Sequence, residues 1–191
     1  MTAWATLLSR LVRMVEGEQS MSSMADRFRE LSDAVPIPRP WSLDAYVAVV
    51  AEYRKRPITL APMDTSGLGG TGCGTGSGLW IARHDDDIIV YDRDTSPWHA
   101  QHIVLHEVGH MLLDHGQQHT GQPDAVGSDA LSRLLPSISL DSVRRVLGRD
   151  AYGDDYERDA EAFADAAMLH ATQPPPPNSS MRRTFFRGRR R

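Results

Sequence analysis

The first forty residues carry two patterns of apolar residues at helical spacing. Residues 2–16 place leucines, valines and a tryptophan three or four positions apart with arginines between them, which predicts an amphipathic helix. A second helical pattern covers 24–34, and three alternating prolines then interrupt the chain. We therefore expect 1–40 to form an N-terminal helical extension.

A third helix is predicted over 43–54, and its start is well marked. Ser42 can accept a hydrogen bond from a backbone N–H of the first turn. Trp41 and Tyr46 have the spacing of a hydrophobic staple across that start. This helix opens the segment 41–171, which we expect to form one folded domain.

Three short apolar runs predict a small β-sheet. They cover 57–61, 79–83 and 88–91, and the polar residues between the last two indicate a β-hairpin. Between the first two lies 67–78, which holds seven glycines in twelve positions. This segment is either a flexible linker or a flap over an active site, and its composition favours the linker. Cys73 lies within it, and we interpret this single cysteine as a loop residue rather than an inhibitory metal ligand.

The longest apolar pattern predicts a helix over 97–114, with Ser96 as its N-cap and Gly116 ending it. Three further helices are predicted downstream, over 130–135, 140–147 and 155–170. Together these patterns predict an α+β fold, in which a sheet of about three strands packs on the 97–114 helix and its companions.

The composition suits a soluble globular protein. The chain has 191 residues, of which 40% are hydrophobic and 24% charged, so one domain is the default expectation. No apolar run approaches the length of a transmembrane helix, and the N-terminus lacks the features of a signal peptide. A single cysteine cannot form an intrachain disulfide. We therefore expect a cytoplasmic protein with no membrane partner.

The net charge of −4 conceals two parts of opposite sign. Residues 172–191 contain six arginines and no acid, so the rest of the chain is strongly acidic. We expect 172–191 to be a disordered tail, rich in proline and arginine, that could contact acidic surfaces. Such a tail alone would bind nucleic acid in a salt-dependent, sequence-blind way, so no direct sequence-specific contact with nucleic acid is expected.

The most informative residues for chemistry read His-Glu-Val-Gly-His at 106–110. His106 and His110 are four apart, so on a helix their imidazoles lie on one face and can bind one Zn²⁺. Glu107 is placed to accept a proton from a metal-bound water, as in zincin metalloproteases. Apolar neighbours on both sides indicate a buried helix, where such polar groups are costly without a metal or a hydrogen-bond network.

A catalytic zinc site usually has a third protein ligand. His115 falls one residue short of the metzincin position, so a carboxylate of the last helix is the better candidate. Glu157 either supplies it or only closes a capping box with Asp154. Glu161, one turn later, could accept the outer N–H of a ligand histidine. His99 and His102 lie on roughly the same side of the helix as the motif. They could line an active-site cleft, stabilise an oxyanion or be inert.

The helix that carries His106 to His110 and the last predicted helix resemble the ImmA/IrrE family of zinc metallopeptidases. The resemblance covers about 41–171. The family's second motif looks like Glu-x-x-Ala-Asn-x-Phe-Ala. The chain matches it at Glu157 and at the alanine, phenylalanine and alanine that follow, and departs from it at Glu161, where the family usually has asparagine. The resemblance implies a zincin-like minimal metallopeptidase that binds one Zn²⁺ through His106, His110 and Glu157.

For function, the resemblance implies limited proteolysis of a regulatory protein partner, typically a helix-turn-helix repressor or an antitoxin, with Glu107 as the catalytic base. The alternative is a zinc-fold regulator or toxin component that acts by protein binding without cleavage. A third hypothesis, a nucleic-acid binder using the arginine tail, has only the generic charge of 172–191 in its favour.

Overall fold

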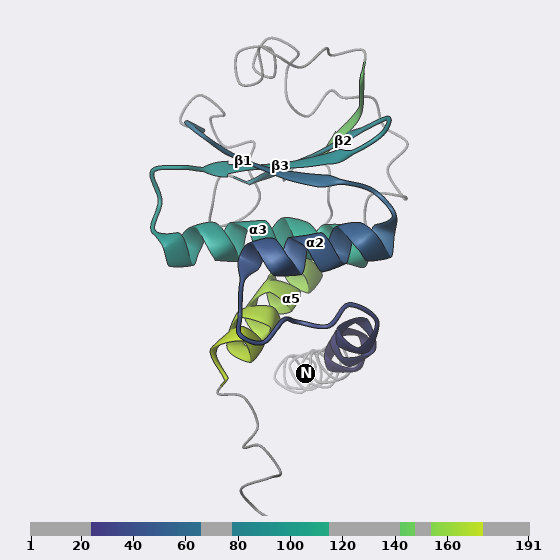
Figure 1. Ribbon diagram of the computed structural model, residues 1–191, viewed down its shortest axis with the longest axis vertical. Coiled ribbons are helices and arrows are strands. Elements are labelled where there is room, and N and C mark those ends of the chain that lie inside the picture. Colours follow the sequence, from purple (N-terminus) through teal and green to yellow (C-terminus); the bar gives the residue numbers. More distant parts are fainter. Residues whose placement is uncertain (1–23, 66–77, 115–141, 148–153, 174–191) are drawn as a thin grey trace, which may run out of the picture.

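The computed structural model describes residues 24–65, 78–114, 142–147 and 154–173. These residues form an α+β fold in layers (Figure 1): a four-stranded sheet lies on one side, helices α2 and α3 lie beneath it, and α5 crosses beyond them. The expected α+β class is confirmed. The segments 2–16, 67–77, 130–135 and 174–191, with Cys73, His115 and Gly116, lie outside the described residues.

The sheet is mixed, with the strand order β1-β3-β2-β4. Its strands are β1 Ile58–Met63, β2 Leu79–Arg83, β3 Asp87–Asp92 and β4 Val143–Leu147. β2 and β3 pair antiparallel, which confirms the predicted hairpin, and β1 lies parallel to β3. β4 pairs antiparallel with the other side of β2.

β4 corrects one prediction. The sequence pattern predicts a helix over 140–147, but 143–147 is a strand, so the sheet has four strands rather than three. The run Val-Arg-Arg-Val-Leu is too short for periodicity to separate a helix from a strand. Its valines favour the strand, and β2 offers an edge with which the run pairs, Ile81 lying opposite Val146. Tertiary pairing therefore decides the structure of this segment.

The helices agree closely with the apolar pattern. A helix covers 24–34, α2 covers Leu43–Arg54, α3 covers Pro97–Leu112 and α5 covers Asp154–Thr172. α3 is two residues shorter than predicted, and Asp114 then adopts a left-handed backbone conformation with φ 57°. Asp tolerates that conformation better than most residues, so the chain can leave the helix there before any glycine.

Both predicted N-caps are confirmed. The Ser42 side chain accepts a hydrogen bond from the Ala45 N–H at 3.3 Å, and that of Ser96 accepts one from the His99 N–H at 3.2 Å. The rings of Trp41 and Tyr46 lie 5.9 Å apart, centroid to centroid, across the start of α2, as the hydrophobic staple requires. These local contacts fix where α2 and α3 begin, and α3 carries the His-Glu-Val-Gly-His motif.

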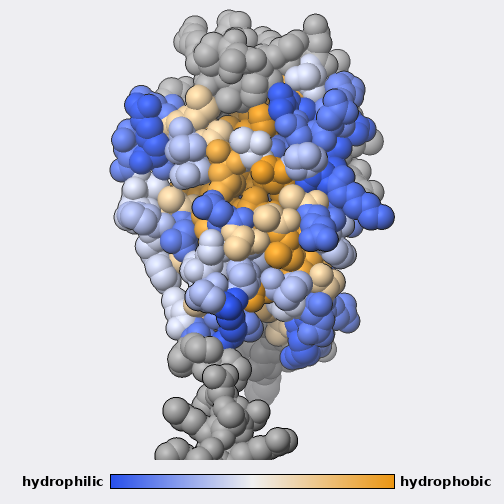
Figure 2. Space-filling view, in the orientation of Figure 1, coloured by the Kyte–Doolittle hydropathy of each residue, from blue (hydrophilic) through white to orange (hydrophobic). Residues whose placement is uncertain are grey.

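Apolar packing places α3 at the centre of the fold. All residues from Ile103 to Leu112 are buried. Strand alternation sends Trp80 and Ile89 into the core shared with the helices, whereas their neighbours pack into a second cluster of buried residues. In Figure 2 apolar side chains gather along the middle of the viewed face between hydrophilic margins. None of the described helices is long and apolar enough to cross a membrane.

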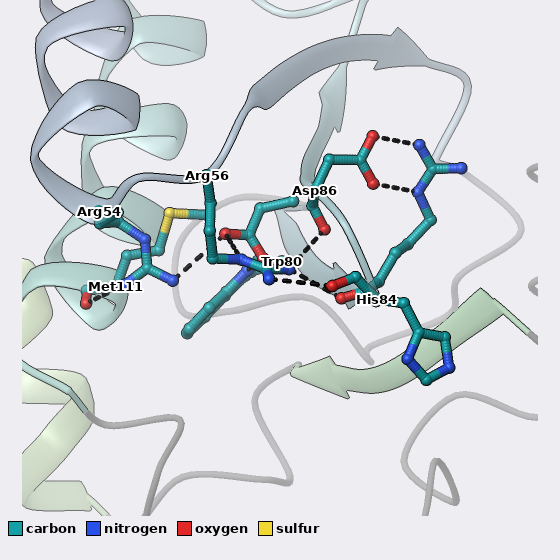
Figure 3. A network of polar contacts seen from close by, with 8 residues as sticks. Arg54, Arg56, Trp80, His84, Asp86 and Met111 are labelled. Carbon is teal, nitrogen blue, oxygen red and sulfur yellow. Dashed lines mark hydrogen bonds and ion pairs between the residues drawn. The ribbon is translucent and has the colours of Figure 1, made fainter.

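A buried ion-pair network ties the sheet to the helices (Figure 3). Asp87 is fully buried, and it accepts hydrogen bonds of 3.2 Å from the Trp80 indole and from the guanidinium groups of Arg54 and Arg56. Arg54 also donates to the Met111 carbonyl at 2.7 Å, and Arg56 donates to three carbonyls of the β2–β3 turn. One carboxylate thus joins the end of α2, the hairpin and the last turn of α3.

We expect Asp87→Asn to lower the free energy of unfolding by about 3 kcal/mol, because it leaves two partly buried guanidinium groups without a counter-charge. Denaturant unfolding of the metal-free protein measures the loss. Asp26→Asn is the control, because the Asp26–Arg29 pair is largely exposed and its loss should cost less than about 1 kcal/mol. Equal effects of the two substitutions would contradict a structural role for the Asp87 network.

Candidate metal centre

The candidate site lies beside a close contact between α3 and α5. A Cβ atom added to Gly109 would stand 3.2 Å from the Cα and carbonyl oxygen of Ala160 and 3.2 Å from the Phe163 ring. Ala160 and Ala164 are fully buried. Ala160 is therefore a small residue that lets α5 approach the motif helix closely. Gly109, a free position of the motif pattern, proves to be the other half of that contact.

This approach brings together the three predicted metal ligands. The Nε2 atoms of His106 and His110 are 3.1 Å apart, and the Glu157 carboxylate oxygens lie 3.5 and 3.3 Å from them. Three ligand atoms on a tetrahedral zinc ion, each at about 2.0–2.1 Å, are separated from one another by about 3.3 Å. The donor types and their spacing therefore fit one face of a zinc coordination shell.

Glu157 consequently has the position expected of a ligand. Both of its carboxylate oxygens face the two imidazoles, and only 19% of its side chain is exposed. A residue that served only to close the first turn of α5 would direct its carboxylate back to that turn. The contacts to both histidines favour the ligand interpretation over the capping box.

The electrostatics of the cluster show how its charges compensate one another. Burial raises the pKa of Glu157, but the two histidines, through hydrogen bonding and charge together, outweigh burial and lower its pKa to about 2. Burial lowers the pKa of His106, but its hydrogen bond with Glu157 and three neighbouring carboxylates together raise it. Burial, and then the charge of His106, keep the pKa of His110 below its usual value. The metal-free cluster is thus a negative carboxylate shared by two imidazoles, of which His106 takes up a proton more readily.

Glu107 lies inside the same buried region and is fully shielded from solvent. Its negative charge is among the effects that raise the pKa of His106. Gly78 approaches it closely, because a Cβ atom there would stand 2.7 Å from Glu107 Oε1 and 2.6 Å from Ile103 Cγ2. The predicted base is therefore held against the start of β2. The sequence does not signal this contact, because Gly78 is one of seven glycines in a run that carries no motif.

The remaining candidates divide into two groups. Glu161 lies beside the ligands, with Oε2 3.2 Å from His106 Nδ1, as expected for a residue that holds the outer nitrogen of a ligand histidine. His102 is next to Glu161, at 3.8 Å between Nε2 and Oε1. His99 stacks on His102 at a centroid distance of 6.5 Å, and no contact with the three ligands is recorded for it in the described part of the chain.

Comparison with known proteins adds no further evidence: no family model, no curated protein and no solved structure matches this chain. The case for its function therefore rests on the geometry of the site and on the resemblance of its two motifs.

An added methyl group should have different effects at Gly78 and at Gly109. Gly78→Ala should destabilise the fold by about 1–3 kcal/mol, because the methyl overlaps Ile103 and Glu107. Zinc affinity should change little, since the atoms nearest to the added methyl belong to these two residues and not to a ligand. Gly109→Ala should lower zinc affinity instead, because it pushes α5 and Glu157 away from the histidines. Denaturant unfolding and competition with a chromogenic chelator measure both quantities. Loss of zinc affinity confined to Gly78→Ala would contradict this geometry.

The low pKa of Glu157 predicts the acid response of the metal-free protein. Because its pKa falls from 4.5 to about 2 on folding, the carboxylate stabilises the fold fully above pH 4.5, and this contribution is lost as the pH falls toward 2. The difference in free energy of unfolding between wild type and Glu157→Gln, measured with a chelator present, should therefore shrink over that interval. A difference independent of pH would show that Glu157 is not held by the histidines in solution.

Proposed function

We propose that this protein is a zinc-dependent metallo-endopeptidase with a zincin-like fold, which cleaves a regulatory protein partner. The observation that carries the proposal is the convergence of two imidazole nitrogens and one carboxylate at 3.1–3.5 Å, with a second, fully buried carboxylate next in sequence to the first ligand. Two nitrogen ligands and one carboxylate, with room for water, form one of the common catalytic zinc sets.

Each residue then has a distinct part in peptide hydrolysis. His106, His110 and Glu157 would bind one zinc ion, which when present would supply a Lewis acid able to activate water and polarise a carbonyl. Glu107 accepts the proton of the attacking water and returns it to the amine that leaves.

The nature of the substrate follows from the resemblance alone. A helix-turn-helix repressor or an antitoxin is the partner that the ImmA/IrrE-like motifs imply.

The test of the enzyme is Glu107→Gln, which keeps the shape of the side chain and removes the proton acceptor. With zinc restored, we expect this variant to bind one zinc per chain while cleaving peptides at least about 100-fold more slowly than the wild type. Incubation with a peptide library prepared from digested cellular proteins, followed by mass spectrometry of new termini, measures cleavage. Metal analysis of the same samples measures zinc.

Glu157→Ala is the matched comparison, because it should lose zinc as well as cleavage. Cleavage by Glu107→Gln at the wild-type rate would sink the mechanism. The alternative, a regulator that acts by contact, would be favoured by two results together. The wild type would bind zinc but yield no new termini, and the wild type and Glu107→Gln would bind a regulatory protein equally well.

A further inference from the structure

The metal ligands are part of a longer array of alternating imidazoles and carboxylates. α3 presents three histidines at four-residue spacing, His102, His106 and His110, and α5 presents three acids at the same spacing, Glu157, Glu161 and Asp165. Four-residue spacing places each set along one face of its helix. The two sets interleave in opposite chain order, so that His110 contacts Glu157 whereas His102 contacts Asp165.

The distances show that the array continues beyond the metal ligands. From the buried end outward, the successive nitrogen-to-oxygen distances are 3.3, 3.5, 3.2, 3.8 and 3.2 Å. Exposure rises in the same direction, since the His110 and His106 side chains are 0% and 7% exposed and Asp165 is 71% exposed. The buried half of the array is the candidate zinc site, and the outer half joins it where Glu161 meets the His106 ring.

The junction between the two halves is the His106 ring, whose two nitrogens face different partners. Nε2 faces His110 and Glu157, whereas Nδ1 lies 3.2 Å from Glu161 Oε2. A neutral imidazole that offers Nε2 to a metal must carry its proton on Nδ1. A carboxylate that accepts that Nδ1–H holds the tautomer and ring orientation and makes Nε2 a stronger donor to the metal.

We propose that Glu161 is a positioning residue for the metal centre: its carboxylate accepts the Nδ1–H of His106 and thereby directs Nε2 toward the metal. Beyond Glu161, His102 Nε2 lies 3.2 Å from Asp165 Oδ1 and 3.8 Å from Glu161 Oε1, so it is within hydrogen-bond distance of Asp165 and only adjacent to Glu161. The role rests on the proposed zinc site, and it gives a function to the residue at which this chain departs from the ImmA/IrrE-like motif.

The competing explanation is that the outer half binds a metal ion of its own. His102, Glu161 and Asp165 offer three ligand atoms that lie within 4.8 Å of one another. However, the Glu161 and Asp165 side chains are 40% and 71% exposed, so water competes for these ligands. The number of zinc ions bound therefore separates the two explanations.

The experiment compares Glu161→Ala, Glu161→Gln and Asp159→Ala with the wild type as full-length proteins. Zinc affinity, measured by competition with a chromogenic chelator, should fall about 10- to 100-fold in Glu161→Ala. It should fall less in Glu161→Gln, because the amide oxygen still accepts the Nδ1–H. Asp159 is the matched control, because it lies on α5 and pairs with Arg27 outside the array, so its loss should leave zinc affinity unchanged.

A spectroscopic readout distinguishes positioning from general loss of structure. In the zinc-loaded wild type the Nδ1 proton of His106 should resonate far downfield and exchange slowly, and in Glu161→Ala it should be lost to exchange while one zinc remains bound. Unchanged zinc affinity in Glu161→Ala overturns the proposal. A wild type that binds two zinc ions, one of them lost in Glu161→Ala, overturns it in favour of a ligand role. Failure of the wild type to bind zinc overturns the proposed function itself, and the positioning role with it.

Discussion

The close contact between Gly109 and Ala160 is the constraint on which the candidate site depends. With a Cβ on Gly109, α3 and α5 would have to separate, because the added atom would stand 3.2 Å from the backbone of Ala160. Separation by a few tenths of an ångström would spoil the 3.3–3.5 Å spacing between Glu157 and the two histidines. The motif on α3 therefore provides only two of the three candidate ligands. The close packing of small residues lets α5 bring the third, Glu157, to them.

This packing also explains how so many ionisable groups can be buried together. His106, Glu107 and His110 lie in the core, where unpaired polar groups would cost several kcal/mol each. Glu157 comes from α5 and places its carboxylate between the two histidines. This contact lowers the pKa of Glu157 to about 2 and raises the pKa of His106. In the metal-free protein the raised pKa of His106 favours a proton on this imidazole, next to the carboxylates. A metal ion would replace that proton, so metal binding and proton release are coupled at this residue.

The sequence predicted best what depends on short stretches of chain. The N-caps at Ser42 and Ser96 and the extents of α2 and α5 follow from local patterns, and so does the orientation of two histidines four apart on α3. Local pattern failed at 143–147, because a five-residue apolar run takes its conformation from the strand beside it. It also gave no sign of the Gly78–Glu107 contact or of the Asp87 network, since each joins residues that lie far apart in sequence and carry no shared motif.

Two sets of polar contacts hold α3 in position. At its last turn, where backbone carbonyls lack helical partners, Arg54 satisfies the Met111 carbonyl and links it through Asp87 to the hairpin. Along the face toward α5, the alternating histidines and acids limit the rotation of α3 against α5. Apolar packing of α3 against the sheet and α5 is non-directional and would tolerate small rotations of the helix. Hydrogen bonds and ion pairs are directional, so these two sets of contacts are what can hold two imidazole nitrogens to the tolerance that a metal requires.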